Sequence, residues 1–575
     1  MYRHQHPNQL KMDIPFGVEL DADNYWVRVS KLIPWEQIDT EYRKNFEGNE
    51  GQLAKSSRLA FGALFIQKHE GFTDEQTRRN IQENPYLQYF CGFECYTMLS
   101  PFDQSMMTHF RKRISAEMVQ KINEIAFKDE VMKTIENASD TGNVKAAAKG
   151  DQMAGGALES DKQKCDTVKE EVAANEKQCQ KEKVSQAGGM REKEETKALP
   201  ESVTSACNTV TEEVTAKQEN EQEQSQGADV SQAVPPKNRG TLILDGTCIP
   251  ADIHFPTDIN LLNKAREIAE IIIDILYDSN RWLFENKPRT YRESARKEYV
   301  IYSKKRRHTS KEIRQCIHRS LLYLKRDLGH IEAMIQKGCK LTELPKDVYR
   351  KLLVIQEIHR QQWEMYNNKT NQISDRIVSI SQPHVRPIVR GKAGSPTEFG
   401  AKAVVGLVGG YAFVITASWD NISEAKQLIK AAEEYRRIFG FYPERILGDR
   451  AYPTNENRAW CKAKGIRLSG PRKGRKSPEE TLEESKMLYQ DGCDRIPIEG
   501  TFGVCKRRYD LDRISTKLTN TSMTSICMGF FVANMERKLR LFFLSFYYCF
   551  LQFYLLLPNR LYYFVHYTYL FRVIQ

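Results

Sequence analysis

The sequence predicts an α/β core that follows an all-α N-terminal domain and a disordered linker. Three observations support this prediction. Between residues 241 and 469, short apolar runs that end in glycine or aspartate alternate with stretches of helical spacing, as in α/β folds. The first 130 residues contain helical patterns and capping signals. Between Phe127 and Phe255 the chain has no aromatic residue, and the polar part of this stretch cannot bury enough apolar surface to fold.

Length, charge and cysteine usage limit the class of protein. The chain has 575 residues, enough for at least two hydrophobic cores. Its formal net charge is +11 and its pI is about 8.8, which suits a polyanionic partner. The 13 cysteines include no C-x-x-C pair, so we expect free thiols in a reducing cytosol rather than a zinc site. The N-terminus has no apolar h-region, so no signal peptide is expected.

The N-terminal domain, residues 1–130, is expected to be a set of short helices. Residues 59–66 are apolar on every side, which predicts a buried helix. Thr73 and Gln76 have the spacing of a capping box, which predicts a helix that ends before Pro85.

The last helix of this domain is expected to start at Ser100 and to end in a basic cluster that contains Arg111 and Arg113. Such a cluster on a small helical domain suits contact with DNA. The alternative is a helical packing domain whose basic end is only solvated.

Residues 131–239 are expected to form a low-complexity, disordered linker. Glu, Lys, Gln, Ala, Ser and Thr dominate this stretch. It shows no sustained heptad pattern, although its composition would allow transient helix.

Two predicted strands of the catalytic domain, residues 240–540, each contain an aspartate. The first strand reads TLILDGTCI and contains Asp245; the second reads RILGDRAY and contains Asp449. An acidic residue in or at the end of a buried strand is costly unless it is paired or binds a metal. Either aspartate alone is also explained as a helix cap or a turn residue.

A later helix supplies a third carboxylate, Glu499. Arg495 lies four residues before it and Lys506 seven residues after it, so the three side chains share one helix face. This pattern suits a site that binds a metal with the carboxylate and a phosphate with the cations. The alternative is an amphipathic helix with salt bridges between successive turns. Combined with the two aspartates, Glu499 predicts a divalent-metal site with oxygen ligands.

Residues 281–370 are expected to form a helical insertion between the first and second core strands. This segment is the most basic part of the chain, with tyrosines interleaved, and it contains Lys304, Lys305, Arg306 and Arg307. Such a patch suits the phosphate backbone of DNA. The alternative is a charged helix face that its own glutamates partly neutralise.

The remaining core elements follow from local patterns. We expect strands over residues 376–380, 399–407, 411–416 and 466–469, and helices over residues 421–439 and 455–464. Gly409 and Gly410 predict a hairpin turn. Asp258 is expected to cap the helix after the first strand. The basic loop with Arg472 and Lys473 either holds DNA or is a solvated turn.

The C-terminal tail, residues 541–575, begins with 17 uncharged and largely aromatic residues, 541–557. This run is slightly short of the ~20 residues that a membrane span needs. We expect a last helix packed on the core or a tail that the fold does not need, with a membrane span as the alternative.

Taken together and in order, LILDGT, LGDRAY and R-x3-E-x6-K resemble the acidic triad of bacterial insertion-sequence transposases of the DDE type. The similarity is to the group whose glutamate lies in an R…E…K helix. These proteins have an RNase H-like catalytic core, so the resemblance implies an α/β RNase H-like fold here. One departure is Gly492, at a position where this group often has tyrosine.

The resemblance implies a DNA transposase that binds the ends of an insertion sequence and catalyses metal-dependent DNA cleavage and strand transfer. Asp245, Asp449 and Glu499 would hold two Mg²⁺ ions, with Mn²⁺ as a substitute. Arg495 and Lys506 would contact phosphates or orient the glutamate. The implied partners are double-stranded DNA, as element ends and target, and a second copy of the chain in a homodimer; no small-molecule cofactor is implied.

The expected location is cytoplasmic and nucleoid-associated. Two alternatives to an active transposase remain at this stage. One is an inactive, DNA-binding relative that keeps the fold. The other is a protein tethered to a membrane through residues 541–575.

Overall fold

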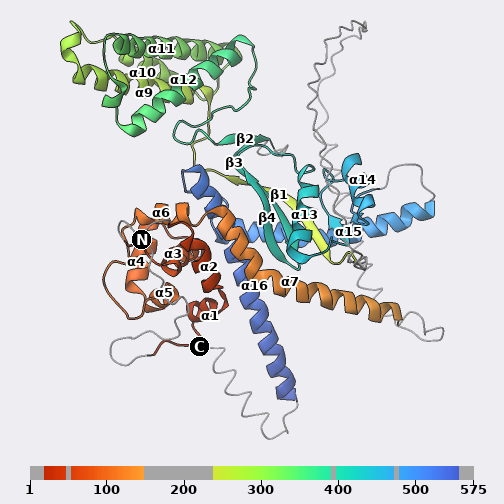
Figure 1. The fold of residues 1–575 in the computed structure, drawn as a ribbon. Coiled ribbons are helices and arrows are strands. Elements are labelled where there is room, and N and C mark those ends of the chain that lie inside the picture. Colours follow the sequence, from red (N-terminus) through yellow and green to blue (C-terminus); the bar gives the residue numbers. More distant parts are fainter. Residues whose placement is uncertain (1–18, 47–52, 148–236, 390–396, 472–477, 556–575) are drawn as a thin grey trace, which may run out of the picture. The chain divides into compact units, whose positions relative to one another are not determined.

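A computed structural model describes residues 19–46, 53–147, 237–389, 397–471 and 478–555 (Figure 1). The chain divides into two units, Met1–Asp140 with Pro236–Gln575, and Thr141–Pro235. Apart from the last turns of one helix, all elements described below belong to the first unit.

Short helices make up the described part of the N-terminal region, as the sequence predicts. They are α1 (Tyr25–Leu32), α2 (Trp35–Arg43), α3 (Ser57–Glu70), α4 (Asp74–Glu83), α5 (Pro85–Phe90) and α6 (Met106–Arg113). Helix α3 is buried from Ser57 to Lys68 because other helices surround it, which confirms the apolar pattern of residues 59–66. Thr73 and Gln76 form the predicted capping box at the start of α4.

The start of the last predicted helix in this region is wrong by about a turn and a half. Helix α6 begins at Met106 rather than Ser100. The Ser105 N–H donates to Asp103 Oδ1 at 2.9 Å, and this local turn competes with helix at the preceding residues.

The predicted start of the linker at residue 131 is also wrong. Helix α7 (Ala116–Ala147) continues through that position, and Val131 and Ile135 are buried in the same core as the N-terminal helices. The burial of these two apolar side chains could not be inferred from the mostly polar composition of the surrounding stretch. Residues 148–236 of the predicted linker lie outside the described residues.

The described residues of the core form one six-stranded mixed sheet. Its strands are β1 (Thr241–Pro250), β2 (Arg386–Val389), β3 (Thr397–Val408), β4 (Tyr411–Ser418), β5 (Arg445–Leu447) and β6 (Arg467–Leu468). The order is β2-β3-β1-β5-β6, and β4 pairs with β3 beyond the part that β2 occupies. Strands β2, β3, β4 and β1 pair antiparallel, whereas β1–β5 and β5–β6 are parallel.

The β3–β4 hairpin confirms the predicted turn. Gly409 and Gly410 have φ of +57° and +84°, the left-handed conformation that a two-residue hairpin turn requires at both positions. The strand predicted over 376–380 is wrong: these residues form no ladder, and the Ile377 N–H instead donates to the side chain of Gln361 at 2.9 Å. Instead, strand β2, a few residues later in the chain, pairs with β3 in the sheet.

Helices α13 (Gln427–Phe439) and α14 (Asn455–Ala463) follow β4 and β5. The first begins six residues later than predicted and ends, as predicted, at Gly440, whose φ is +88°. Helix α13 packs on β4 and β1, so it covers the sheet next to the ends of the central strands.

Amide side chains from two helices cover the free edge of β4. Asn534 accepts from the Ala412 N–H at 2.8 Å and donates to the Ala412 carbonyl at 2.7 Å. Asn123 donates to the same carbonyl at 3.0 Å, and Gln120 donates to the Val414 carbonyl at 3.2 Å. An edge strand otherwise exposes such groups to pairing with other chains.

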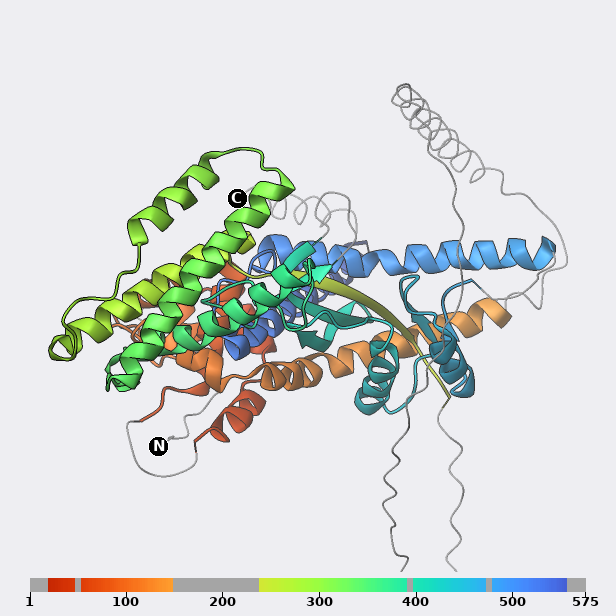
Figure 2. The same ribbon diagram turned by 90° about the horizontal axis from the view of Figure 1, so that it is seen from above.

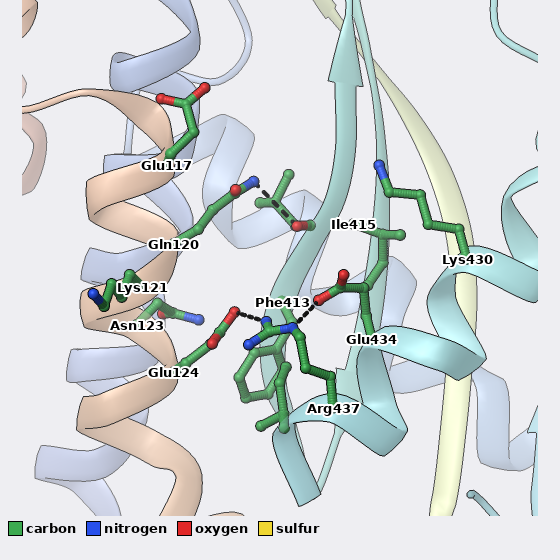
Figure 3. Close-up of a pocket in the computed structure, with 12 residues that line it drawn as sticks. Glu117, Gln120, Lys121, Asn123, Glu124, Phe413, Ile415, Lys430, Glu434 and Arg437 are labelled. Atoms are coloured by element: carbon green, nitrogen blue, oxygen red, sulfur yellow. Dashed lines mark hydrogen bonds and ion pairs between the residues drawn. The ribbon is translucent and has the colours of Figure 1, made fainter. Parts of the chain in front are cut away.

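A polar cleft of about 410 Å³ lies beside this edge, between α7 and α13 (Figure 3). Arg437 bridges it, with ion pairs to Glu124 at 2.5 Å and to Glu434 at 2.8 Å. The Arg437–Glu124 ion pair therefore ties α13 to α7, and no residue predicted to be catalytic lines the cleft.

Four helices lie between β1 and β2, α9 (Asp258–Ser279), α10 (Arg292–Lys304), α11 (Ser310–Gln336) and α12 (Lys346–Asn367) (Figures 1 and 2). A separate hydrophobic core holds α9, α11 and α12 together, and α10 contributes no residue to it. The prediction that Asp258 caps α9 is wrong. Thr257 is the N-cap residue, and its side chain accepts the capping hydrogen bond from the Asn260 N–H. Asp258 instead accepts from Gln362 at 2.8 Å and from Arg376 at 2.6 Å, which ties α9 to α12.

Two long helices complete the core, α15 (Pro478–Arg508) and α16 (Thr519–Leu555). Helix α16 packs against β4, α3 and α6, and its Phe531 stacks edge-on against Phe61 and Phe65 of α3. Among the described residues, α16 included, no helix is long and apolar enough to cross a membrane. Residues 556–575 of the predicted tail lie outside them.

Candidate active site

Strand register brings the two predicted aspartates to equivalent positions. In the parallel β1–β5 pair, Thr241 lies opposite Arg445 and Ile243 opposite Leu447. Extending this register by two residues sets Asp449 opposite Asp245. Neighbouring parallel strands are about 4.8 Å apart, so Asp245, within β1, and Asp449, two residues beyond the end of β5, lie at the same level on adjacent strand paths.

Helix α15 is anchored to these strands by two arginines. Arg467 of β6 holds Asp491 with bonds of 2.6 and 2.9 Å, and Arg445 of β5 pairs with Asp494 at 2.7 Å. Asp491 is only 4% exposed, so its ion pair with Arg467 is buried and holds α15 against β6. One turn later, the helix presents Arg495 and Glu499 at the strand ends.

Arg495 joins the second aspartate to the glutamate. Its guanidinium lies 3.3 Å from Asp449 Oδ1 and 3.3 Å from Glu499 Oε1. The side chains of Asp449 and Glu499 are 54% and 61% exposed, whereas that of Arg495 is 25% exposed. Both carboxylates are therefore open to solvent and can rotate, while the cation between them is partly fixed.

The carboxyl of Asp245 has a raised pKa. Burial raises its pKa to about 6; the Gly246 N–H and Arg495 oppose this rise, and the charges of Glu424 and Asp449 add to it. The Gly246 N–H donates to Asp245 Oδ1 at 2.8 Å. A carboxylate that is desolvated and crowded by other carboxylates gains most when a cation approaches.

The donor chemistry of this group fits a hard divalent cation, because it offers only carboxylate oxygens. Side-chain positions fit less directly. Within the described residues, no three His, Cys, Asp or Glu side chains lie close enough together to hold one ion. Asp449 and Glu499 would have to turn from Arg495 toward Asp245, which their exposure allows.

Two residues at this site were not predicted from the sequence. Glu424, in the turn before α13, lies against Gly246. Tyr452 is fully buried, and its hydroxyl has no hydrogen-bond partner among the described residues. The sequence signalled Tyr452 only as the last letter of RILGDRAY, and nothing local singled out Glu424.

The predicted DNA contacts in the helical insertion lie on its surface. Lys304, Lys305, Arg306 and Arg307 are all exposed, at the turn between α10 and α11. Lys305 pairs with Glu312 at 2.5 Å. Among the described residues, the other three have no ion-pair partner.

Charge is distributed unevenly along the chain. Residues 281–370 contain 22 Lys and Arg against 10 Asp and Glu, a net charge of +12. The whole chain has +11, so the remaining residues sum to −1. The basic character inferred from composition therefore belongs to the insertion.

The N-terminal basic cluster does not form the phosphate-facing surface that we predicted. Arg111 is only 6% exposed and donates to Gln67 at 2.8 Å and to Asp74 at 3.1 Å. Arg113 is half-buried, with its guanidinium 4.9 Å from the ring centroid of Phe46. Both arginines serve packing because the end of α6 is covered by neighbouring helices.

Three further predicted contacts remain. Lys506 lies on α15 two turns beyond Glu499 and is partly buried. Arg472 and Lys473 fall outside the described residues.

Comparisons with known proteins bear on both ends of the chain. A family model described as a transposase DDE domain matches residues 446–536, which include Asp449 and Glu499 but not Asp245. A second, described as a transposase domain (DUF772), matches residues 16–113. These matches support an insertion-sequence DDE transposase, and a DDE domain implies an RNase H-like fold.

A curated relative covers a smaller region. The protein named "Uncharacterized protein ORF8 in nfe locus" from Rhizobium meliloti is 34% identical over 96 residues. The match covers 17% of this chain and 46% of that protein, so the chain spans about half the length of this relative. No solved structure matches the chain.

Proposed function

We propose that this chain, whose matched domains support an insertion-sequence DDE transposase, binds the ends of its element and catalyses DNA cleavage and strand transfer. One observation carries the proposal. Asp245 lies within β1, level with Asp449 just beyond the end of the adjacent parallel strand β5, and Arg495 links Asp449 to Glu499. Three carboxylates from distant parts of the sequence thereby lie around one arginine, and Asp449 and Glu499 would turn toward Asp245 to share an ion with it.

In this proposal Asp245, Asp449 and Glu499 hold two Mg²⁺ ions. When bound, such a pair of ions activates water or a 3′-hydroxyl and stabilises the attacking and leaving oxygens of an in-line displacement at phosphorus. The protein's own part is to supply the oxygen ligands from a rigid sheet edge and an anchored helix. Arg495, released from the two carboxylates, is in reach of a phosphate at the same place.

The insertion supports a duplex as substrate. Its net charge of +12 and the exposed cations at the α10–α11 turn would neutralise phosphates without reading sequence. Two element ends must be held together for transposition, so we propose a homodimer in the DNA complex.

The test is Mg²⁺-dependent cleavage of DNA that carries the element's own ends. Wild type is compared with Glu499→Gln, which keeps the size of the side chain but removes its charge. Glu483→Gln is the matched control, because Glu483 is an exposed glutamate on the same helix. We expect wild type and the control to cleave, and Glu499→Gln to bind DNA without cleaving it.

Two results would contradict the proposal. Equal cleavage by wild type and Glu499→Gln would exclude Glu499 as a metal ligand. Binding without cleavage by all three proteins would favour an inactive, DNA-binding relative.

A further inference from the structure

Each catalytic aspartate has a glycine beside it, and each glycine makes room for another side chain. A Cβ atom added to Gly246 would lie 2.4 Å from Glu424 Oε1 and 2.6 Å from its Cδ. A Cβ atom added to Gly448 would lie 2.7 Å from Cδ2 of Tyr452. Contacts this short do not occur, so a side chain at either glycine would force Glu424 or Tyr452 to move from its position.

Lys402 holds Glu424 in this position. Its Nζ lies 3.0 Å from Glu424 Oε1 and also donates to the Ile422 carbonyl at 2.9 Å. The two side chains are only 15% and 22% exposed. A pair so shielded, with a second bond on the lysine, has a defined geometry, unlike an exposed surface pair.

The strand register sets this pair behind the aspartates. Lys402 of β3 lies opposite Cys248 of β1, two residues beyond Gly246. Alternate residues of a strand share one face and directly opposed residues of neighbouring strands share it too. Lys402 and Gly246 therefore belong to one face of the sheet, and Asp245 to the other.

Tyr452 lies near the same residues, Glu424 and the two aspartates. Burial, and then the charges of Glu424, Asp245 and Asp449, raise the pKa of its hydroxyl. All three carboxylates therefore lie near one buried hydroxyl that has no hydrogen-bond partner among the described residues. Glu424 and Tyr452 together back the ends of the two strands that carry Asp245 and Asp449.

We propose that Glu424, fixed by Lys402 and seated against Gly246, is a positioning residue that sets the strand ends for divalent-cation binding. The inference rests on the proposed function, since it concerns the same site. Glu424 acts in two ways: it fills the space behind β1, and it adds a negative charge close to Asp245. Both effects favour a cation at Asp245 over an empty site.

The structure offers two separate ways to disturb Glu424. Glu424→Gln keeps the shape and can still accept from Lys402, but it removes the charge. Gly246→Ala keeps the charge but displaces the carboxylate, and this displacement costs little stability because only the far end of a flexible side chain must move. Glu434→Gln is the control, because Glu434 is also an ion-paired glutamate but lies in the cleft beside α7.

The experiment is a Ca²⁺ titration of the full-length protein without DNA, read as the shift in melting temperature. We expect Glu424→Gln and Gly246→Ala to raise the Ca²⁺ concentration at half-maximal shift about tenfold, the size of other losses of support around metal ligands. The control should match wild type. Glu424→Ala and the double variant Gly246→Ala/Glu424→Ala should match each other, because the added methyl then has nothing to displace.

The outcomes separate this inference from the proposed function. Asp245→Asn should abolish the Ca²⁺ shift; if wild type shows no shift, or Asp245→Asn keeps it, both proposals are overturned. If the shift depends on Asp245 but stays within twofold of wild type in Glu424→Gln and Gly246→Ala, this inference alone is wrong. A purely structural role is the result if these variants melt earlier without Ca²⁺ but keep the wild-type midpoint.

Discussion

Asn534 offers the sharpest test of how helix α16 stabilises the β-sheet. This side chain is 2% exposed and makes three hydrogen bonds, two with the backbone of Ala412 and one to Asn123 Oδ1 at 2.9 Å. Replacing it with alanine leaves the buried Ala412 N–H without a partner. The Ala412 carbonyl still accepts from Asn123.

The expected loss follows from the number of groups left unpaired. A buried donor or acceptor without a partner costs about 1–3 kcal/mol. Asn534→Ala strands the Ala412 N–H and one acceptor of Asn123, so we expect a loss of about 3 kcal/mol. Asn123→Ala strands no backbone group, because Asn534 still serves both atoms of Ala412, and we expect a loss of about 1 kcal/mol.

Urea unfolding followed by circular dichroism measures both variants. With a slope of about 3 kcal/mol/M, a loss of 3 kcal/mol lowers the midpoint by about 1 M. Asn520→Ala on the same helix is the control, since Asn520 is exposed and should change the free energy of unfolding by less than about 0.5 kcal/mol. Equal losses for Asn534→Ala and Asn123→Ala, or a loss no larger than that of the control, would refute the hydrogen-bond argument.

Three further predictions concern charged groups. Burial alone would lower the pKa of His69, but bonds to Glu536 and Glu70 raise it to about 9. Because this value lies above the unfolded value near 6.5, the resulting stabilisation, on the order of 3 kcal/mol, is complete below pH 6.5 and is lost as pH rises through 9. His69→Gln should remove this dependence of the free energy of unfolding on pH. Replacing Lys304, Arg306 and Arg307 with glutamine should reduce the slope of log affinity for DNA against log salt concentration by about 3. Arg360→Gln, which removes a cation already paired with two glutamates, should change this slope less. Equal slopes in both variants would contradict the assignment of the α10–α11 turn as the DNA-binding surface. Arg111→Ala should lower the free energy of unfolding by about 2 kcal/mol through its lost pair with Asp74 and leave the salt slope unchanged; a weaker DNA affinity at normal stability would restore Arg111 as a contact.

Local patterns predicted those elements whose cause is local. The Gly409–Gly410 turn, the capping box at Thr73 and the end of α13 at Gly440 each depend on a few neighbouring residues. Residues 376–380 have the composition of a strand, yet Gln361, on the preceding helix and 16 positions before Ile377, accepts the hydrogen bond of the Ile377 N–H. Arg111 looked like part of an exposed basic cluster, and only the position of Asp74 shows why it is buried. These errors arise where a tertiary partner outweighs a local preference.

The same division runs through the candidate site. Asp245 and Asp449 could be predicted because a carboxylate at the end of an apolar strand is costly wherever the strand lies, and because parallel register then brings the two together. Sequence alone explains the glycines beside them as turn residues. In the structure they leave room for Glu424 and Tyr452, and Glu424 is separated from Gly246 by 178 positions, including a helical insertion with its own core. A residue that fills space behind a strand has no periodic sequence pattern of its own. What the sequence shows of such a residue is the glycine on the strand that makes room for its side chain.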